Sequence, residues 1–260
     1  MTELRPYLGP LLHAAGFRHG FFGRRGGDSA GNYASLNCSF SVGDDPDRVH
    51  RNHVRIAAYL GVQLERLVTV CQVHGSAVVD ADEFPHLDSH CNREADALIA
   101  TRADYALGIR TADCVPVLVG CRDTGAVAAI HAGWRGIVAG VVPAAIERMV
   151  SKGARPNAMV VAVGPHIGVR AFEVSEEVAA QLAAVDHEGK SIERSGCSRP
   201  RVRLSSIVLS QLISKGVRPN QIDLVEACTF ENTSELFSFR RDGVHSGRQL
   251  SAICPEPRAH

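Results

Sequence analysis

The chain has 260 residues, of which 45% are hydrophobic and 22% charged, and its 28 basic residues equal its 28 acidic residues in number. These values are ordinary for a globular protein that buries a substantial core, and the lack of net charge gives no reason to expect nucleic acid or an anionic membrane as partner. No apolar stretch reaches the ~18 residues of a membrane span, and the first residues lack a secretory signal. We expect a cytoplasmic protein, present as a monomer or weak homodimer.

The N-terminal third is expected to contain one long helix. Residues 1–17 are predicted to form an edge element, and the Gly-, Ser- and Asn-rich stretch 20–37 a long structured loop. A helix follows within 42–60, where Asp44 or Asp45 can cap the first turn. The spacing of its apolar residues is helical, which is typical of an element packed on one face.

This helix is expected to end at Gly61, since glycine readily adopts the left-handed conformation of a helix end. His50 and His53 share one of its faces, and we expect that face to be solvated. The β-branched stretch 67–79 predicts two strands around a tight bend at His74-Gly75, and a polar surface loop is expected over 81–92.

The remaining pattern favours an α+β fold. Further strands are expected over residues 95–101, 107–110, 115–119, 126–130, 158–163, 222–228 and 250–254. Further helices are expected over 137–149, with Trp134 and Arg135 at its start, over 175–185, with Ser175 as its cap, and over 204–216. Because strands follow one another through short turns, mixed sheets flanked by helices are favoured over a doubly wound Rossmann fold. No linker or repeat divides the chain, so residues 1–260 are expected to form a single domain.

Three soft-metal donors lie beside turns at the ends of predicted strands. They are His74, Cys114 and His131. Two His and one Cys suit Zn²⁺, and three protein ligands leave one tetrahedral position for water or substrate, which is typical of a catalytic site. The donors are far apart in the sequence, so no short zinc motif supports the hypothesis. The eight cysteines include no Cys-x-x-Cys pair, and reduced thiols are expected.

The same residues permit other chemistries. Cys114 activated by His131, with Asp113 or Asp96 orienting the base, would give a Cys–His hydrolase or deamidase. A second cluster of donors lies in the loop that contains His86, Asp88, His90 and Cys91, where a solvated surface is the simpler interpretation. A multicopper site is poorly supported, because the sequence has no His-x-His pair.

Several arginines lie beside glycines or in turns. They are Arg24, Arg25, Arg135, Arg240, Arg241 and Arg248. A guanidinium group can bind phosphate or carboxylate through two hydrogen bonds. Surface ion pairs are the alternative for most of them, and we expect only some to face a cleft.

The chain resembles the YfiH-like laccase-domain family, long described as polyphenol oxidases and now as purine nucleoside phosphorylases with adenosine deaminase activity. The matching segments, in order, are RRGGDSAGNYASLN at 24–37, VGDDP at 42–46, QVHG at 72–75, EADALIAT at 94–101, TADCVPVL at 111–118, HAGWRG at 131–136, GPHIG at 164–168, FEVSEEV at 172–178 and LFSFRRDGVHSGR at 236–248. They run from near residue 20 almost to the C-terminus and are jointly highly specific.

The resemblance implies a Zn²⁺ site formed by His74, Cys114 and His131, which would also be the catalytic residues. It implies phosphorolysis of adenosine, inosine, guanosine and methylthioadenosine, deamination of adenosine, and a fold related to the deamidase domain of necrotizing toxins. The older family description allows copper. The matching segments include the expected contacts to nucleoside and phosphate, namely Arg24, Arg25, Asn37, Arg240, Arg241 and Arg248.

A few positions depart from the family pattern. Cys38-Ser39 stands where Leu-Gly is usual, and His53 where Arg is usual. Ser175 replaces a usual Gly, and His245-Ser246 precedes Gly247-Arg248 where Thr is typical. These departures leave the three metal donors unchanged, but Cys38 and His53 affect what can be inferred about the pocket and its substrate preference.

Overall fold

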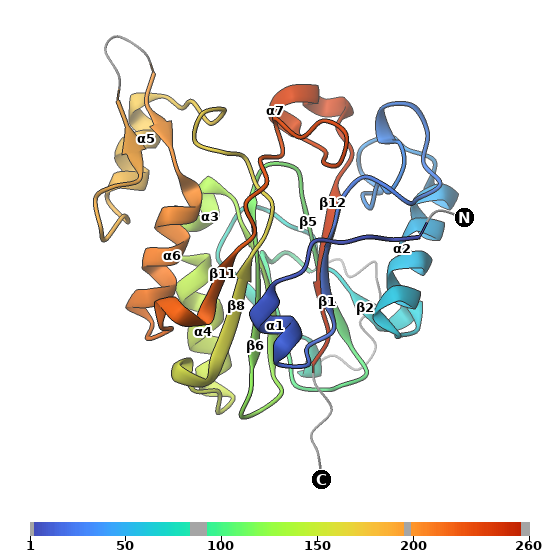
Figure 1. Cartoon of the computed structure of the whole chain (residues 1–260), viewed down its shortest axis with the longest axis horizontal. Coiled ribbons are helices and arrows are strands. Elements are labelled where there is room, and N and C mark those ends of the chain that lie inside the picture. The colour runs from blue at the N-terminus through green and yellow to red at the C-terminus, as the bar shows by residue number, and fades with distance from the viewer. Residues whose placement is uncertain (1–2, 84–92, 195–198, 256–260) are drawn as a thin grey trace.

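The computed structural model describes residues 3–83, 93–194 and 199–255. Two β-sheets lie in the middle of the molecule, with helices on their outer sides (Figure 1). This arrangement confirms the predicted α+β class with mixed sheets. The predicted donor cluster His86, Asp88, His90 and Cys91 lies outside the described residues.

Both sheets mix parallel and antiparallel pairs. The larger sheet has the order β11-β8-β6-β7-β4-β3, and the smaller has the order β1-β12-β5-β2. The strands of the larger sheet are β3 (Val78–Asp80), β4 (Ala97–Ala100), β6 (Val115–Cys121), β7 (Val127–Ala132), β8 (Met159–Val163) and β11 (Ile222–Leu224). Those of the smaller sheet are β1 (His19–Phe22), β2 (Leu67–Val68), β5 (Ala106–Thr111) and β12 (Gln249–Ile253). A separate pair consists of β9 (Ile192–Glu193) and β10 (Arg201–Val202).

The helices surround the two sheets (Figure 1). They are α1 (Pro10–Ala14), α2 (Pro46–Leu60), α3 (Trp134–Val138), α4 (Val141–Ser151), α5 (Glu176–Ala183), α6 (Leu204–Ser214) and α7 (Phe239–Asp242). Figure 1 shows α4 and α6 beside the larger sheet and α2 at the far side of the smaller one. Within the described part of the chain, no helix is long and apolar enough to span a bilayer.

The core follows from the alternation of side chains along the strands. In β6, Val117 and Val119 pack toward the helices of the larger sheet, whereas Leu118 packs into the core that also contains residues of the smaller sheet. On the outer side of the smaller sheet, Ile56 and Leu60 of α2 are buried in one cluster with its strands. The burial of both faces explains why β6 is apolar throughout.

Local signals set several element ends as predicted. The Asp45 side chain accepts a hydrogen bond from the amide of Asp47 (2.9 Å) and caps α2, and Gly61 ends that helix at φ 67°. The Ser175 hydroxyl accepts the amide of Val178 (3.3 Å) and caps α5. These contacts are local in sequence, which is why sequence alone revealed them.

Some predicted elements are wrong in extent. The helix expected over 137–149 is two helices, because Gly140 adopts φ 81° between α3 and α4. The edge element expected over 1–17 includes α1 as well as a single bridge between Tyr7 and Phe21. The strand expected over 222–228 ends at Leu224.

The expected exposure of His53 is also wrong. His53 is buried and its Nε2 lies 3.1 Å from the carbonyl oxygen of Cys38, whereas His50 on the same helix is exposed. Its ring packs edge-on against Phe40, with 5.2 Å between centroids. His53 lies about one turn before Ile56 and two turns before Leu60, on the apolar stripe that α2 turns toward the core.

Candidate active site

Strand pairing brings the candidate metal donors together at one end of the strands of the larger sheet. His131 is in β7 and pairs with the start of β6, which Cys114 directly precedes. On the other side of β7, Asp96 directly precedes β4, and its carbonyl oxygen accepts the amide of His131 at 2.7 Å. His74 lies in the bend before β3, which pairs with β4. The sheet therefore sets the relative positions of residues that are distant in the sequence.

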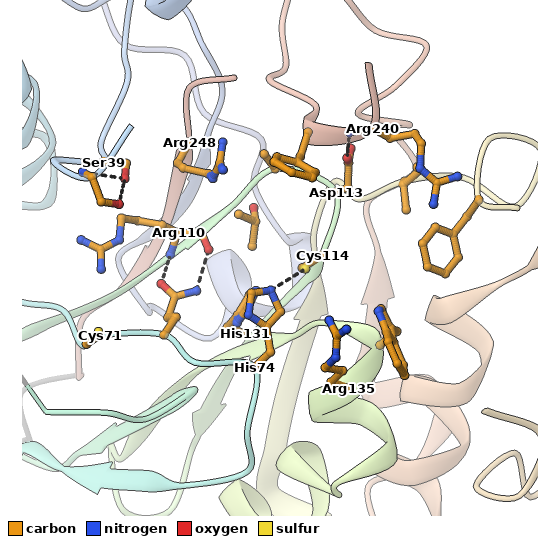
Figure 2. A pocket seen from close by; sticks show the side chains of 18 residues that line it. Ser39, Cys71, His74, Arg110, Asp113, Cys114, His131, Arg135, Arg240 and Arg248 are labelled. Carbon is orange, nitrogen blue, oxygen red and sulfur yellow. Dashed lines mark hydrogen bonds between the residues drawn. The ribbon is translucent and has the colours of Figure 1, made fainter. Parts of the chain in front are cut away.

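The predicted trio is brought together (Figure 2). One ligand atom from each of His74, Cys114 and His131 lies within 4.8 Å of the others, and the Cys114 sulfur is 3.9 Å from Nε2 of His74. The two imidazole rings meet edge-on, with centroids 4.9 Å apart. His74 is exposed, Cys114 is partly buried and His131 is buried. This group could hold a metal ion that remains accessible from one side.

Asp96 is the carboxylate that organises the trio. It is fully buried, and Nδ1 of His131 lies 2.7 Å from its Oδ1. Its carboxylate also accepts the amides of Val73 (3.2 Å), His74 (2.9 Å) and Gly75 (2.6 Å), which fixes the bend in which His74 has φ 61°. Burial opposes its ionisation, but the His131 and Gly75 hydrogen bonds hold the pKa of Asp96 below its ordinary value.

The sequence left Asp96 and Asp113 as alternatives for the group that orients His131. The contact at 2.7 Å belongs to Asp96. With Nδ1 engaged in this way, Nε2 of His131 is the ring nitrogen left to serve as a ligand or a base. A carboxylate behind a ligating histidine also fixes the ring orientation and raises its basicity.

Without a metal ion, the surroundings of Cys114 and His131 favour a thiolate–imidazolium pair. Burial disfavours the thiolate, yet attraction to His131 and hydrogen bonds to His131 and His74 lower the pKa of Cys114 to about 6. Burial likewise disfavours the imidazolium, but Cys114 and Asp96 raise the pKa of His131 to about 9. The thiolate is the form that binds metal or acts as nucleophile. The site is therefore suited to metal binding and to nucleophilic catalysis by Cys114.

Gly133 shows that the space between the donors is closely fitted. A Cβ at this position would lie 2.9 Å from Cδ2 of His74 and 3.0 Å from the Cys114 sulfur. The backbone of Gly133 has φ −72°, which any residue can adopt, so the close approach of the two donors is what requires glycine. The three donors lie close together beside Gly133, which has no side chain. Such a set of borderline-soft donors fits a small ion such as Zn²⁺.

We expect Gly133→Ala to fold but to bind metal about tenfold or more weakly, as is usual when the groups that orient metal ligands are disturbed. The added methyl group must push His74 and Cys114 apart. Competition with a chromophoric chelator would measure the zinc affinity, and circular dichroism would confirm the fold. Wild-type affinity in this variant would contradict the close packing of the donors.

A cavity of about 560 Å³ opens beside the trio. Its polar and basic lining includes Ser39, Ser41, Gln72, Arg110 and Arg248, and its apolar lining includes Trp134, Ile167, Phe172 and Phe239. Figure 2 shows Ser39 and Arg110 on one side of the trio and Arg135 and Arg240 on the other. The cavity therefore combines arginines with aromatic rings, and three of these arginines stack on rings: Arg135 on Trp134, Arg240 on Phe172 and Arg248 on Phe239.

Arg110 and Arg248 line the cavity without forming an ion pair to a carboxylate in the described part of the chain, although the charge of Asp113 acts on Arg248. The guanidinium of Arg110 donates to the Val70 carbonyl (2.7 Å), and that of Arg248 donates to the carbonyls of Ser246 (2.6 Å) and Gly247 (3.0 Å). Burial and the nearby Arg248 lower the pKa of Arg110. Two arginines that line one cavity without an ion-pair partner favour an anionic ligand.

Of the six predicted substrate contacts, Arg240 and Arg248 line the cavity. Asn37 is buried behind it, where its Oδ1 accepts the amide of Arg248 (2.9 Å) and its Nδ2 donates to Asp44 (2.9 Å). Asn37 therefore supports the position of Arg248 and does not line the cavity itself.

The other three predicted arginines also lie outside the cavity lining. The guanidinium of Arg24 donates to the Ala34 carbonyl (2.8 Å) and stacks on Phe237, and that of Arg25 pairs with exposed Glu235 (2.7 Å). The guanidinium of Arg241 donates to the carbonyls of Thr229 (2.8 Å), Phe230 (3.1 Å) and Leu236 (3.0 Å). Arg24 and Arg241 thus bind backbone carbonyls and Arg25 binds a carboxylate, and a local sequence pattern does not reveal these partners.

Arg110 lines the cavity although no sequence motif marks it. This residue is the penultimate residue of β5, shortly before Cys114, and its backbone N–H and carbonyl both bond the Gln72 side chain (2.7 Å each). Its place at a strand end next to a proposed metal donor was the signal that could have found it.

Comparisons with known proteins place this arrangement in a family. Residues 18–256 match the model of a family described as "Multi-copper polyphenol oxidoreductase laccase". A protein of Streptomyces coelicolor named "Purine nucleoside phosphorylase SCO2081" is 42% identical over 229 residues, covering 87% of this chain and 91% of its own. A Bacteroides thetaiotaomicron protein named "Purine nucleoside phosphorylase" is 39% identical over 238 residues, covering 88% of each chain.

Solved structures agree with the sequence comparisons. YlmD from Geobacillus stearothermophilus superposes with a TM-score of 0.89 at 30% identity, covering 99% of this chain and 98% of that one. Bacillus licheniformis YfiH superposes with a TM-score of 0.85 at 26% identity over 92% of both chains. The fold, the family match and these relatives together show that this chain belongs to the YfiH-like laccase-domain family.

Proposed function

We propose that this protein is a zinc-dependent purine nucleoside phosphorylase acting on adenosine, inosine, guanosine and methylthioadenosine, with adenosine deaminase activity. The names of its relatives support the phosphorylase. The observation that carries the proposal is the candidate metal trio in one cavity with Arg110 and Arg248, neither of which forms an ion pair with a described carboxylate. Phosphate is an anion that two guanidinium groups can bind.

The cavity has suitable size and chemistry for these substrates. Its volume of about 560 Å³ falls within the roughly 300–1,000 Å³ of small-molecule sites. We assign phosphate to Arg110 and Arg248 and the purine to the side lined by Trp134 and Phe172, where aromatic rings can stack on a base. In phosphorolysis a phosphate oxygen bonds to C1′ of the ribose as the bond to the purine breaks, and the anion stabilises the positive charge that develops on the sugar.

His74, Cys114 and His131 would hold the zinc. When bound, zinc supplies a Lewis acid, which can polarise a substrate atom or lower the pKa of water. Asp96 keeps the His131 ring in place through Nδ1 and fixes the bend that carries His74. These two contacts orient the donors before any substrate arrives.

Two alternatives remain as predictions. The family description suggests copper, yet in the described ranges these three donors form the one group of three or more that could hold a metal, whereas a multicopper centre needs several such groups. A Cys–His hydrolase or deamidase is favoured by the thiolate–imidazolium pair of Cys114 and His131. That function predicts thiol-directed inactivation of metal-free protein. The relationship to the necrotizing-toxin fold stays a prediction as well.

Release of hypoxanthine from inosine, followed with and without phosphate, tests the proposed function. We expect Arg248→Gln to raise the KM for phosphate by roughly 10–100-fold, because a lost hydrogen bond to a charged group costs about 1.5–3 kcal/mol. Arg155→Gln is the matched control, since Arg155 pairs with Asp123 on the surface and does not line the cavity. Phosphate-independent turnover, or an unchanged KM in Arg248→Gln, would contradict the assignment.

A further inference from the structure

Asp113 has an unusual backbone conformation next to a metal donor. Its φ is 99°, and among the described residues only His74 and Asp113 are non-glycine residues with positive φ. One of these residues is itself a proposed ligand and the other directly precedes Cys114. Such conformations persist only where the surrounding structure holds them, and they cluster at functional sites.

The Asp113 side chain reaches across to a distant part of the chain. Its Oδ1 accepts the hydroxyl of Thr229 and its Oδ2 accepts the amide of Arg240, both at 2.6 Å (Figure 2 shows the second contact). Asp113 is 8% exposed and Thr229 is fully buried. The Asp113 carbonyl oxygen also accepts the amide of Ile167 (2.9 Å). Both carboxylate oxygens and the carbonyl are thus engaged in holding neighbouring segments.

The segment held by Asp113 forms a wall of the cavity. It begins α7 and contributes Phe239 and Arg240 to the lining. The Arg240 guanidinium donates to the carbonyls of Ala171 (3.2 Å) and Glu173 (3.1 Å) and stacks on Phe172 at 5.2 Å from the ring centroid. A displacement of α7 would therefore also move aromatic rings of the cavity lining.

We propose that Asp113 is a positioning residue. Its hydrogen bonds to Thr229 and Arg240 fix the position of the substrate-binding wall at α7 relative to the proposed metal donor Cys114. This inference rests on the proposed function for its effect on turnover. Both carboxylate oxygens of Asp113 are occupied by groups of the protein, namely the Thr229 hydroxyl and the Arg240 amide. Asp113 therefore acts through α7 and Cys114 and is not the group that activates water or phosphate. It differs in this respect from Asp96, which contacts His131.

Thr229→Val tests the link to the wall, because it removes one donor to Asp113 and nearly preserves the side-chain shape. We expect kcat/KM for inosine phosphorolysis to fall about tenfold through a higher KM, the size expected for loss of a hydrogen bond to a charged group. The control is Thr101→Val, which removes a similar hydroxyl–carboxylate bond (2.7 Å to Asp82) outside the cavity lining. A merely structural role would lower the melting temperature of both variants alike and leave KM unchanged, and that outcome would overturn the proposal.

A second measurement examines the link to Cys114 without relying on turnover. Co²⁺ alone is added to metal-free wild type, Asp113→Asn and Thr101→Val, and the thiolate-to-cobalt absorption band is recorded. We expect the band to shift in Asp113→Asn only. Identical spectra in all three proteins would overturn the proposed link to Cys114. If the wild type showed the band but released no purine from inosine with phosphate, the proposed function would fail while the spectra would still decide the role of Asp113.

Discussion

Cys114→Ala should lose both its metal and its phosphorolysis of inosine. The variant removes the sulfur that lies 3.9 Å from Nε2 of His74 and is the only anionic donor of the trio. Loss of a direct ligand should exceed the roughly 10–100-fold effect of losing a group that merely orients a ligand. Metal content per chain and phosphate-dependent hypoxanthine release are the two measurements.

Cys228→Ala is the matched control for this experiment. The Cys228 sulfur accepts the amide of Gly168 (3.2 Å) and does not line the cavity, so this variant should retain metal and activity. Full phosphate-dependent release of hypoxanthine by metal-free Cys114→Ala would defeat the proposed mechanism. Loss of activity with the metal retained would favour the Cys–His alternative, in which Cys114 acts as nucleophile.

Asp96→Asn should weaken both the fold and the metal site. The carboxylate accepts three amides and lies against Nδ1 of His131, and an amide side chain would turn a donor toward some of these groups. Removing one partner of a buried charged pair costs about 3–5 kcal/mol, and loss of a carboxylate behind a ligating histidine costs about 10–100-fold in metal affinity. Urea unfolding at neutral pH and chelator competition would measure the two effects.

The acid dependence of stability should change with the same substitution. Because the folded-state pKa of Asp96 is lowered, its stabilising contribution is present above the ordinary aspartate pKa of about 3.9 and is lost as the pH falls below it. Asp96→Asn should therefore lose less stability than the wild type on acidification through that range.

Asp82→Asn is the control for both effects of Asp96→Asn. Asp82 also accepts backbone amides, those of Thr101 (2.9 Å) and Arg102 (3.3 Å), but it lies outside the cavity lining. It should lose stability and keep its metal affinity. Equal metal affinity in Asp96→Asn and wild type would show that Asp96 does not orient His131.

The sequence alone was sufficient to predict helix starts and a buried strand, because the features that decide them are local. The caps of α2 and α5 involve residues two or three positions apart, and the apolar run of β6 reflects burial on both faces. The break at Gly140 was missed because a single glycine within an apolar helical pattern is compatible with either a continuous or an interrupted helix.

The roles of individual charged residues depended on long-range packing. Arg24 and Arg241 resemble anion-binding residues in sequence, yet their guanidinium groups donate to backbone carbonyls away from the cavity, which neither residue lines. Arg110 has no motif of its own, yet it faces the cavity because β5 ends there. His53 is buried because α2 packs against the smaller sheet on that side.

The sequence by itself determined the α+β class and the principal capped helices, and its ordered motifs predicted His74, Cys114 and His131 as metal donors, which the structure brings together. Only the tertiary structure decided that Asp96 supports His131 while Asp113 holds α7, because the first contact depends on the pairing of β4 with β7 and the second on a hydrogen bond to Thr229, 116 residues away. Side-chain type limits what a residue can bind, whereas strand register and chain packing decide which partner lies within reach.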